Sequence, residues 1–209
     1  MHHIDKIIIY YDKDEVLLII DSERILFSLK NYSDFNIKEK DIIDNDIYEK
    51  ICIRSEYHNC LKKAFRAISY SNISKKQLYR KLKSEFSENI IVKVLDRLTE
   101  MHYINDAENA KRYAEIYQKR LYGKQRIITE LMKRGFERED IRIAVDELEV
   151  NQEEYNENIV LLIKKKFKEQ KIDRENKQKV YLYLRNKGYS SSDISSAINR
   201  IVDEDDIQN

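Results

Sequence analysis

The sequence has no proline, no tryptophan and only three glycines among its 209 residues. A loop that cradles phosphates needs several closely spaced glycines, so an intrinsic NTPase of this kind is excluded. The chain also has only two cysteines, Cys52 and Cys60, which are too few for a disulfide framework. We expect both thiols to be free in a reducing compartment and to have packing roles.

Long apolar runs are also missing. No stretch approaches the roughly 18 to 20 consecutive apolar residues that cross a bilayer. Residues 1–5 lack the basic start and apolar run of a secretory signal. We therefore expect a cytoplasmic protein without membrane contact. Because 37% of the residues are charged and 42% are hydrophobic, the apolar side chains must form narrow stripes, which favours helices.

The sequence contains no recognisable catalytic or metal-binding set. Cys52, His58 and Cys60 supply too few ligands, at an unsuitable spacing, for a structural zinc. The acidic residues 139–140 and 203–206 are adjacent in sequence, whereas acid–base catalysis needs side chains that converge in a pocket. We interpret them as a helix start and a solvated tail. We therefore expect no catalytic residue, no metal and no cofactor.

Residues 1–50 are predicted to form a β-rich N-terminal extension. Three short runs of β-branched, aliphatic and aromatic residues lie at 6–11, 16–20 and 24–29, separated by polar turns. This pattern is typical of strands. It predicts a small antiparallel meander that serves as a structural cap or a docking element.

From about Ile42 the apolar spacing is helical, and the helical part contains an internal repeat. Similar phrases begin at Phe86, Phe136 and Tyr189, and each has apolar residues five, nine and twelve positions after the aromatic. These positions share one face of a three-turn helix. With the two helices expected before each phrase, the pattern predicts three-helix repeats at residues 51–104, 105–151 and 152–209, the last with an acidic tail.

The predicted fold class is therefore mainly α, with tandem three-helix repeats and a small N-terminal antiparallel β meander. A three-helix unit of this size buries little core alone, so stability should come partly from contact with neighbouring repeats. We expect the repeats to form an elongated, curved array. The first and longest helix of each repeat is expected at residues 57–70, 106–122 and 156–170.

Several helix ends can be predicted from capping residues. Gly135 and Gly188 follow basic residues and stand where a left-handed residue would end a helix. Ser74 begins a capping-box pattern. N-caps are also expected at Asp106, Asp173 and Ser190.

Charge is unevenly distributed, although the net charge is only +1. Residues 1–56 carry −5, residues 57–202 carry +10 and residues 203–209 carry −4. The basic middle suits a polyanion or an acidic protein groove as partner. Lysine-rich helices can also simply keep a narrow-cored protein soluble, so charge alone leaves both interpretations open.

The densest basic stretch, residues 111–134, interleaves cations with tyrosines. Such a mixture can follow phosphates and stack on bases, whereas tyrosines on an apolar stripe are commonly core residues. A second basic cluster lies on the first helix of the third repeat, where a solvated helix end explains it equally well. The candidate partner-binding residues are Arg112, Lys119, Arg120, Lys124, Arg126, Lys133, Arg134, Lys164, Lys165 and Lys166. The candidate core residues of the central stretch are Tyr113, Leu121, Ile127, Leu131 and Phe136.

Three phrases resemble the RecX family, which regulates bacterial RecA. Residues 64–78 look like the family's opening A-L-x-x-L-x-x-R-x-x-S-x-x-E-L. Residues 104–136 are similar to its most specific signature, D-x-x-x-A-x-x-Y followed by R and by G-x-x-x-I-x-x-E-L-x-x-K-G. Residues 165–189 look like its last phrase, K/R-F followed by L-x-x-R-G-F. The resemblance covers residues 57–202, and the β-rich extension matches only some members.

The resemblance implies a non-catalytic modulator of RecA recombinase in DNA repair, recombination and the SOS response. Such a protein binds in the groove of the RecA–DNA filament and limits filament growth, ATPase and strand exchange. The implied partner is the RecA filament, with single- or double-stranded DNA as a possible contact, and we expect a monomer. The alternative is a helical nucleic-acid-binding module that acts mainly on DNA itself. An enzyme is a third hypothesis, but no convergent set of titratable side chains supports it.

Overall fold

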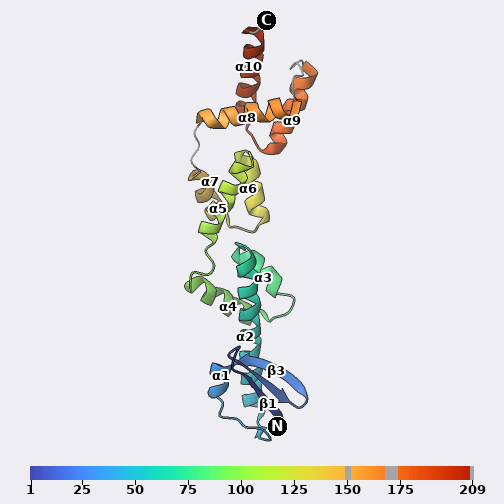
Figure 1. The fold of residues 1–209 in the computed structure, drawn as a ribbon, viewed down its shortest axis with the longest axis vertical. Helices are drawn as coiled ribbons and strands as arrows, with labels where there is room; N and C mark the ends of the chain where they lie inside the picture. The colour runs from blue at the N-terminus through green and yellow to red at the C-terminus, as the bar shows by residue number, and fades with distance from the viewer. Residues whose placement is uncertain (149–151, 168–173, 208–209) are drawn as a thin grey trace. The chain divides into compact units, whose positions relative to one another are not determined.

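The computed structural model describes residues 1–148, 152–167 and 174–207, and the chain divides into two compact units (Figure 1). The first unit, Met1–Ile104, holds an antiparallel sheet and helices, and the second, Asn105–Asn209, is helical in its described parts. The prediction of a mainly helical chain with a small N-terminal antiparallel sheet is confirmed.

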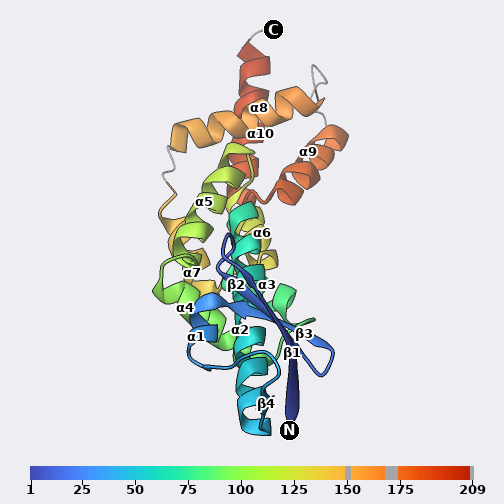
Figure 2. The same cartoon turned by 60° about the horizontal axis from the view of Figure 1, so that its bottom comes forward.

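The sheet has four strands in the order β3-β2-β1-β4, and all neighbouring strands are antiparallel (Figure 2). The strands are β1 (His2–Tyr10), β2 (Glu15–Ile20), β3 (Glu23–Ser28) and β4 (Ile42–Ile43), with a short helix α1 (Leu29–Ser33) after β3. The predicted meander corresponds to β1, β2 and β3. Ile43, which we expected in the helical pattern, instead belongs to β4 and pairs with His2 of β1.

One face of this sheet is covered by α2 (Asn45–Tyr70). Val16 and Leu18 point to this inner face, where Ile51 of α2 packs in the same core. The Asp44 side chain caps the helix by accepting a hydrogen bond from the Ile47 backbone N–H at 2.8 Å. The helix therefore begins close to the point where the apolar spacing becomes helical, and the prediction that the long helix begins at residue 57 is wrong, because the preceding turns pack on the sheet. The expected boundary between residues 50 and 51 lies inside this continuous helix.

Further along, α2 meets the open edge of β3. The Ser55 hydroxyl and the Asn59 side-chain amide donate to the Leu26 carbonyl oxygen at 2.7 and 3.3 Å. These bonds satisfy an edge-strand acceptor that would otherwise face water. One turn later, Lys62 and His58 contact Glu15, the first residue of β2, with Oε1 at 2.5 Å from Lys62 Nζ and 3.1 Å from His58 Nε2.

Replacing Glu15 with glutamine should lower the free energy of unfolding by about 1 to 3 kcal/mol at neutral pH. Burial raises the pKa of the Glu15 carboxyl, but the hydrogen bonds from Lys62 and His58 outweigh it and hold the pKa below its usual range. The unfolded carboxyl, with a pKa of about 4.3, thus binds a proton more readily than the folded one. Denaturant unfolding at several pH values measures this stabilisation by Glu15. It should be fully present above the pKa of the unfolded carboxyl and should be lost as the pH falls through the lower pKa of the folded carboxyl.

The matched control is Glu49→Gln, because Glu49 is an exposed residue on the same helix. Its stability should change by no more than about 0.5 kcal/mol. A Glu15→Gln variant as stable as the parent at pH 7 would show that this buried ion pair contributes nothing.

Three separate apolar cores hold the helices that follow, one for each predicted repeat. The phrases beginning at Phe86, Phe136 and Tyr189 supply each core with its last helix, and the predicted apolar positions of all three are buried or partly buried. The helices are α3 (Lys75–Leu82), α4 (Glu88–Glu100), α5 (Asp106–Lys119), α6 (Lys124–Lys133), α7 (Arg138–Asp146), α8 (Gln152–Phe167), α9 (Arg174–Lys187) and α10 (Ser191–Ile207).

Both cysteines are packing residues, as expected. Cys60 is fully buried in the core around α2, α3 and α4, while Cys52 is half-buried against the core of the sheet. Burial raises the pKa of the Cys60 thiol to about 11, so this side chain stays protonated at neutral pH.

Most predicted helix ends are confirmed. Gly135 and Gly188 adopt the left-handed conformation, with φ of 82° and 92°, and the side chains of Ser74 and Ser190 cap α3 and α10. The prediction for Asp106 is wrong, because the side chain of the preceding residue, Asn105, accepts the hydrogen bond from the Glu108 N–H at 3.1 Å. The remaining predicted cap, Asp173, and the expected last helical residues 168–170 lie outside the described residues. The side chains of the acidic tail, 203–206, are also outside them.

The second and third repeats meet at two glycines. The Gly123 N–H donates to the Lys187 carbonyl oxygen at 2.8 Å, and a Cβ on Gly123 would lie 2.5 Å from the Tyr189 nitrogen. A Cβ on Gly188 would lie 2.8 Å from the Cα of Arg126. Because glycine has no side chain, the backbones of these two repeats can approach closely at both positions.

Leu121 connects the same two repeats. With φ of 56°, it follows the end of α5, which comes earlier than predicted, and it packs against the core of the third repeat. Its carbonyl accepts a hydrogen bond from the Tyr189 hydroxyl at 3.0 Å.

Leu131→Ala should lower the free energy of unfolding by about 2 to 5 kcal/mol, because Leu131 is fully buried in the core of the second repeat. Chemical denaturation followed by circular dichroism measures this change. Leu161→Ala is the matched control, since Leu161 is 55% exposed and should change stability by no more than about 0.5 kcal/mol. Equal effects of the two substitutions would contradict the assignment of Leu131 to the core.

Candidate partner-binding surface

The structure places seven of the ten candidate residues on one helical hairpin of the second repeat. Arg112 and Lys119 lie on α5, Arg120 caps its C-terminus, and Lys124 is the first residue of α6. Further along α6 are Arg126, Lys133 and the C-cap residue Arg134. The other three, Lys164, Lys165 and Lys166, are exposed in the last turn of α8.

A row of tyrosines lies beneath these cations. The ring of Tyr117 stacks on Tyr122, with centroids 5.8 Å apart and planes 9° apart, and on Tyr113 at 6.3 Å and 27°. Tyr117 is buried, whereas Tyr113 and Tyr122 are half-buried. The sequence left open whether such tyrosines belong to the core or to a binding surface. Tyr117 belongs to the core, and the other two border it.

Arg134 is held tightly by this tyrosine row. Its guanidinium carbon lies 3.6 Å from the centre of the Tyr113 ring, and its Nε donates to the Tyr117 hydroxyl at 2.7 Å. Arg126 and Arg120 lie at longer range, 5.7 Å from the Tyr122 ring and 6.0 Å from the Tyr117 ring. Cation–π contact and hydrogen bonding thus make Arg134 part of the framework that shapes the surface.

Other cations of the surface are paired with carboxylates. Arg112 lies 3.2 Å from Glu108, while Arg126 and Lys133 share Glu130 at 2.8 and 3.2 Å. Pairs of this kind near the surface contribute only about 0 to 1 kcal/mol. They do, however, reduce the charge that these three side chains offer to a partner.

Among the seven candidate cations on α5 and α6, three have no carboxylate partner within the described parts of the chain: Lys119, Arg120 and Lys124. All three are exposed, and they lie at or between the end of α5 and the start of α6. We call these three residues the basic segment. It is the part of the candidate surface with the most charge available for an anionic partner.

The structure adds Lys187, which the sequence did not single out as a binding residue. Its Nζ lies 5.0 Å from the centre of the Tyr122 ring, and Arg126 approaches the same ring. Lys187 belongs to α9, so cations from two repeats meet on one tyrosine. Its basic position before Gly188 was the only signal in the sequence, and that signal equally fits a helix end.

Of the candidate core residues, Ile127, Leu131 and Phe136 are buried in the core of the second repeat. Tyr113 and Leu121 are half-buried. Among the residues that the structure describes, no three histidine, cysteine or acidic side chains are grouped so that they could hold a metal ion. Within those same residues, no helix is long and apolar enough to cross a membrane.

The fold defines a helical-repeat protein built of tandem three-helix units. A family model described as "RecX, third three-helix domain" matches residues 152–198. The chain is 31% identical to the regulatory protein RecX of Clostridioides difficile (strain 630), over 97% of this chain and 92% of that protein. It is also 31% identical to the regulatory protein RecX of Caldanaerobacter subterraneus subsp. tengcongensis, over 78% of this chain and 81% of that protein. The chain therefore belongs to the RecX family of regulatory proteins.

Solved structures show the same fold. A crystal structure of a regulatory protein RecX superposes with a TM-score of 0.73 and 20% identity, covering 95% of this chain and all of that chain. The crystal structure of RecX from Lactobacillus salivarius gives a TM-score of 0.62 and 22% identity, covering 71% of this chain and 97% of that chain. The resemblance to this family noted in the sequence is confirmed.

Proposed function

We propose that this protein is a non-catalytic modulator of RecA that acts as a cytoplasmic monomer. It binds in the groove of the RecA–DNA filament and limits filament growth, ATP hydrolysis and strand exchange. Its main contact surface is the basic segment, with the surrounding cations of the second repeat. The observation that carries this proposal is the set of three exposed, unpaired cations beside an ordered tyrosine row.

The position of Lys124 supports an anionic partner. It is the first residue of α6, and no acidic residue lies in the first turn of that helix. A lysine there adds to the positive end of the helix dipole, which disfavours the position by about 0.3 to 1 kcal/mol. A phosphate or carboxylate of a partner would relieve this repulsion and gain from both the lysine and the helix terminus.

We expect a smaller contribution to partner binding from Lys164, Lys165 and Lys166 than from the basic segment. They occupy the last turn of α8, where the helix dipole favours cations, so local structure already accounts for them. They would add a second, weaker contact along the filament. Modest contacts made by different repeats of one chain can sum to a strong interaction through multivalency.

A second function, direct binding to DNA, is favoured by the half-buried tyrosines. Tyr113 and Tyr122 combine partly accessible rings with nearby cations, a pairing that suits stacking on bases. In this alternative the protein acts on DNA itself, and RecA is affected only when the DNA is coated.

Titration of the protein into RecA assembled on single-stranded DNA with ATP, and into the same DNA alone, separates these functions. The proposal predicts loss of RecA ATPase at protein concentrations far below those that coat the DNA. Repeating both titrations at several salt concentrations identifies the phosphate contribution, because each neutralised phosphate steepens the salt dependence of binding. Unchanged RecA ATPase, beside a steeply salt-dependent affinity for DNA, would favour the alternative.

A further inference from the structure

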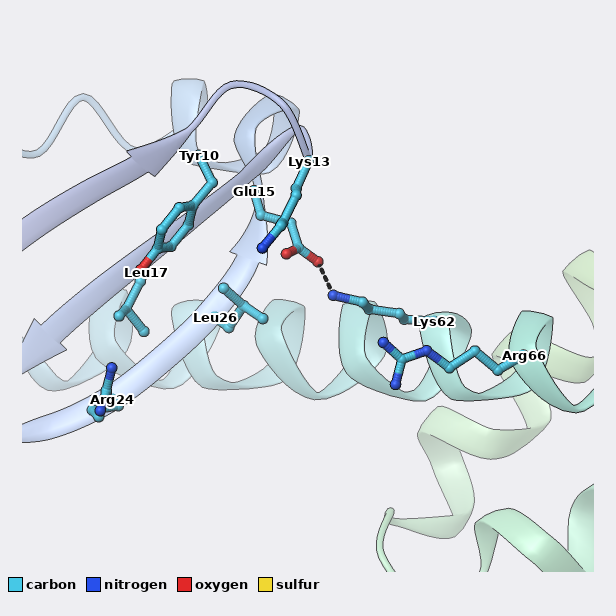
Figure 3. A pocket seen from close by; sticks show the side chains of 8 residues that line it. All are labelled: Tyr10, Lys13, Glu15, Leu17, Arg24, Leu26, Lys62 and Arg66. Carbon is cyan, nitrogen blue, oxygen red and sulfur yellow. Dashed lines mark hydrogen bonds and ion pairs between the residues drawn. The ribbon is translucent and has the colours of Figure 1, made fainter.

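The first unit contains a basic hollow that the proposed function does not use. The hollow, about 790 Å³ in volume, lies on the sheet face opposite the inner face (Figure 3). Leu17 and Leu26 pair across β2 and β3 on this face, and Tyr10 of β1 lies beside them. Four cations border these apolar residues: Lys13, Arg24, Lys62 and Arg66.

A second hollow, about 580 Å³ in volume, adjoins the first on α2. The two share Lys62 and Arg66, which lie one helical turn apart. The second continues past Tyr70 to Lys81 of α3 and is also lined by Lys63 and Glu85. We call the two hollows together the N-terminal groove. It is lined by six cations and two carboxylates.

Both carboxylates are already neutralised by lysines. Glu15 is paired with Lys62, as Figure 3 shows, and Glu85 is paired with Lys63. The remaining four cations, Lys13, Arg24, Arg66 and Lys81, have no carboxylate partner among the described residues. The groove is therefore positive, although residues 1–56 as a whole carry −5. This positive lining suits an anionic ligand.

The aromatic side chains of the groove indicate which anion. Tyr70 is 89% exposed at the end of α2, beside Arg66 and Lys81 in the lining. The Tyr10 ring lies 5.6 Å from the Lys13 ammonium at the other end. Tyr70 is thus open to solvent and Tyr10 is half-buried, and unpaired cations lie between these two rings. Aromatic rings combined with unpaired cations bind the bases and phosphates of single-stranded nucleic acid. An acidic peptide would use the cations but not the two rings.

We propose that the N-terminal groove binds a single strand of nucleic acid. The phosphates contact the unpaired cations, the bases stack on Tyr10 and Tyr70, and the strand follows α2 between them. This site lies in Met1–Ile104, whereas the surface proposed to act on RecA lies in Asn105–Asn209. The first unit thus binds the nucleic acid at a site that is independent of the basic segment.

Photocrosslinking with the full chain tests the proposal directly. A single-stranded oligonucleotide carrying 4-thiothymidine is irradiated with the protein in the absence of RecA, and crosslinked peptides are mapped by mass spectrometry. We expect crosslinks at Tyr10 or Tyr70. They should be lost in Arg24→Glu/Arg66→Glu and retained when Lys119, Arg120 and Lys124 are replaced by glutamate. Failure of the RecA proposal would leave this pattern intact.

Affinity measured by fluorescence anisotropy supplies the second readout. Arg24→Glu/Arg66→Glu should weaken binding about tenfold and reduce the slope of log affinity against log salt by about 1.4. Arg24→Gln/Arg66→Gln should act in the same direction, and circular dichroism should show both variants folded, since both side chains are exposed. Crosslinks confined to residues 105–209, or crosslinks at Tyr10 and Tyr70 that persist in the double variant, would overturn the proposal. Displacement of the oligonucleotide by polyglutamate at equal charge would also overturn it and would indicate an acidic protein partner.

Discussion

Gly188→Ala is expected to lower the free energy of unfolding by about 2 to 5 kcal/mol and to separate the third repeat from the second. Two effects add at this position. The left-handed φ of 92° is unfavourable for any residue with a Cβ, and the added Cβ would overlap the backbone of Arg126. Denaturant unfolding gives the energy, and hydrogen exchange at the Gly123 N–H, which bonds to Lys187, reports the contact between the repeats.

Two further glycine variants separate these effects. Gly123 has an ordinary φ of −73°, so Gly123→Ala tests the close approach without backbone strain. Gly135 shares the left-handed conformation at the end of α6, so Gly135→Ala tests mainly the strain, about 1 to 2 kcal/mol. Faster exchange at the junction should appear for Gly123→Ala and Gly188→Ala but not for Gly135→Ala. Junction exchange as slow in all three variants as in the parent protein would contradict the close glycine contact.

Reversing the charge of the basic segment, by Lys119→Glu/Arg120→Glu/Lys124→Glu, should raise the concentration needed to inhibit RecA ATPase by about tenfold or more. The three side chains are exposed and unpaired, so folding should be unaffected. Glutamate at position 124 should even suit the N-terminus of α6. ATPase titrations, with circular dichroism on the same samples, measure both outcomes.

The matched control reverses three exposed lysines of the first unit, Lys30, Lys38 and Lys50, which changes the net charge by the same amount. This control should inhibit RecA nearly as well as the parent protein at physiological salt, where exposed charges that do not contact the partner are screened. Equal losses in the two variants would assign the effect to net charge alone. An unchanged inhibition curve for the basic-segment variant would exclude that segment from the mechanism.

The helical repeats could be predicted from the sequence because their signals are local. The aromatic and three apolar residues of each phrase share one helical face, so Phe136 and its counterparts identify their cores without any tertiary information. Local chemistry also predicted the left-handed conformations of Gly135 and Gly188. The predicted N-cap, Asp106, is wrong by one position, because the neighbouring Asn105 is an equally good cap and occupies that position.

The features that the sequence did not predict depend on contacts between distant segments. Nothing local shows that Gly123 meets Gly188, that Leu121 packs with the third repeat, or that Lys187 lies over Tyr122. The helical spacing from about Ile42 indicated the start of α2, but not that one helix continues from the sheet into the first repeat, because that continuity depends on packing against the sheet. Within the candidate site, the sequence indicated the basic stretch. Only the structure separates the unpaired basic segment from Arg134, which is held by tyrosines.

A photoreactive amino acid placed at position 120 reports whether the basic segment contacts RecA in the filament. The same group at position 38, on the first unit, serves as the control. With RecA, single-stranded DNA and ATP present, we predict a crosslink from position 120 to RecA that depends on filament assembly and is much stronger than that from position 38. A crosslink from position 120 to DNA alone, or equal crosslinks to RecA from both positions, would show that the basic segment does not bind RecA specifically.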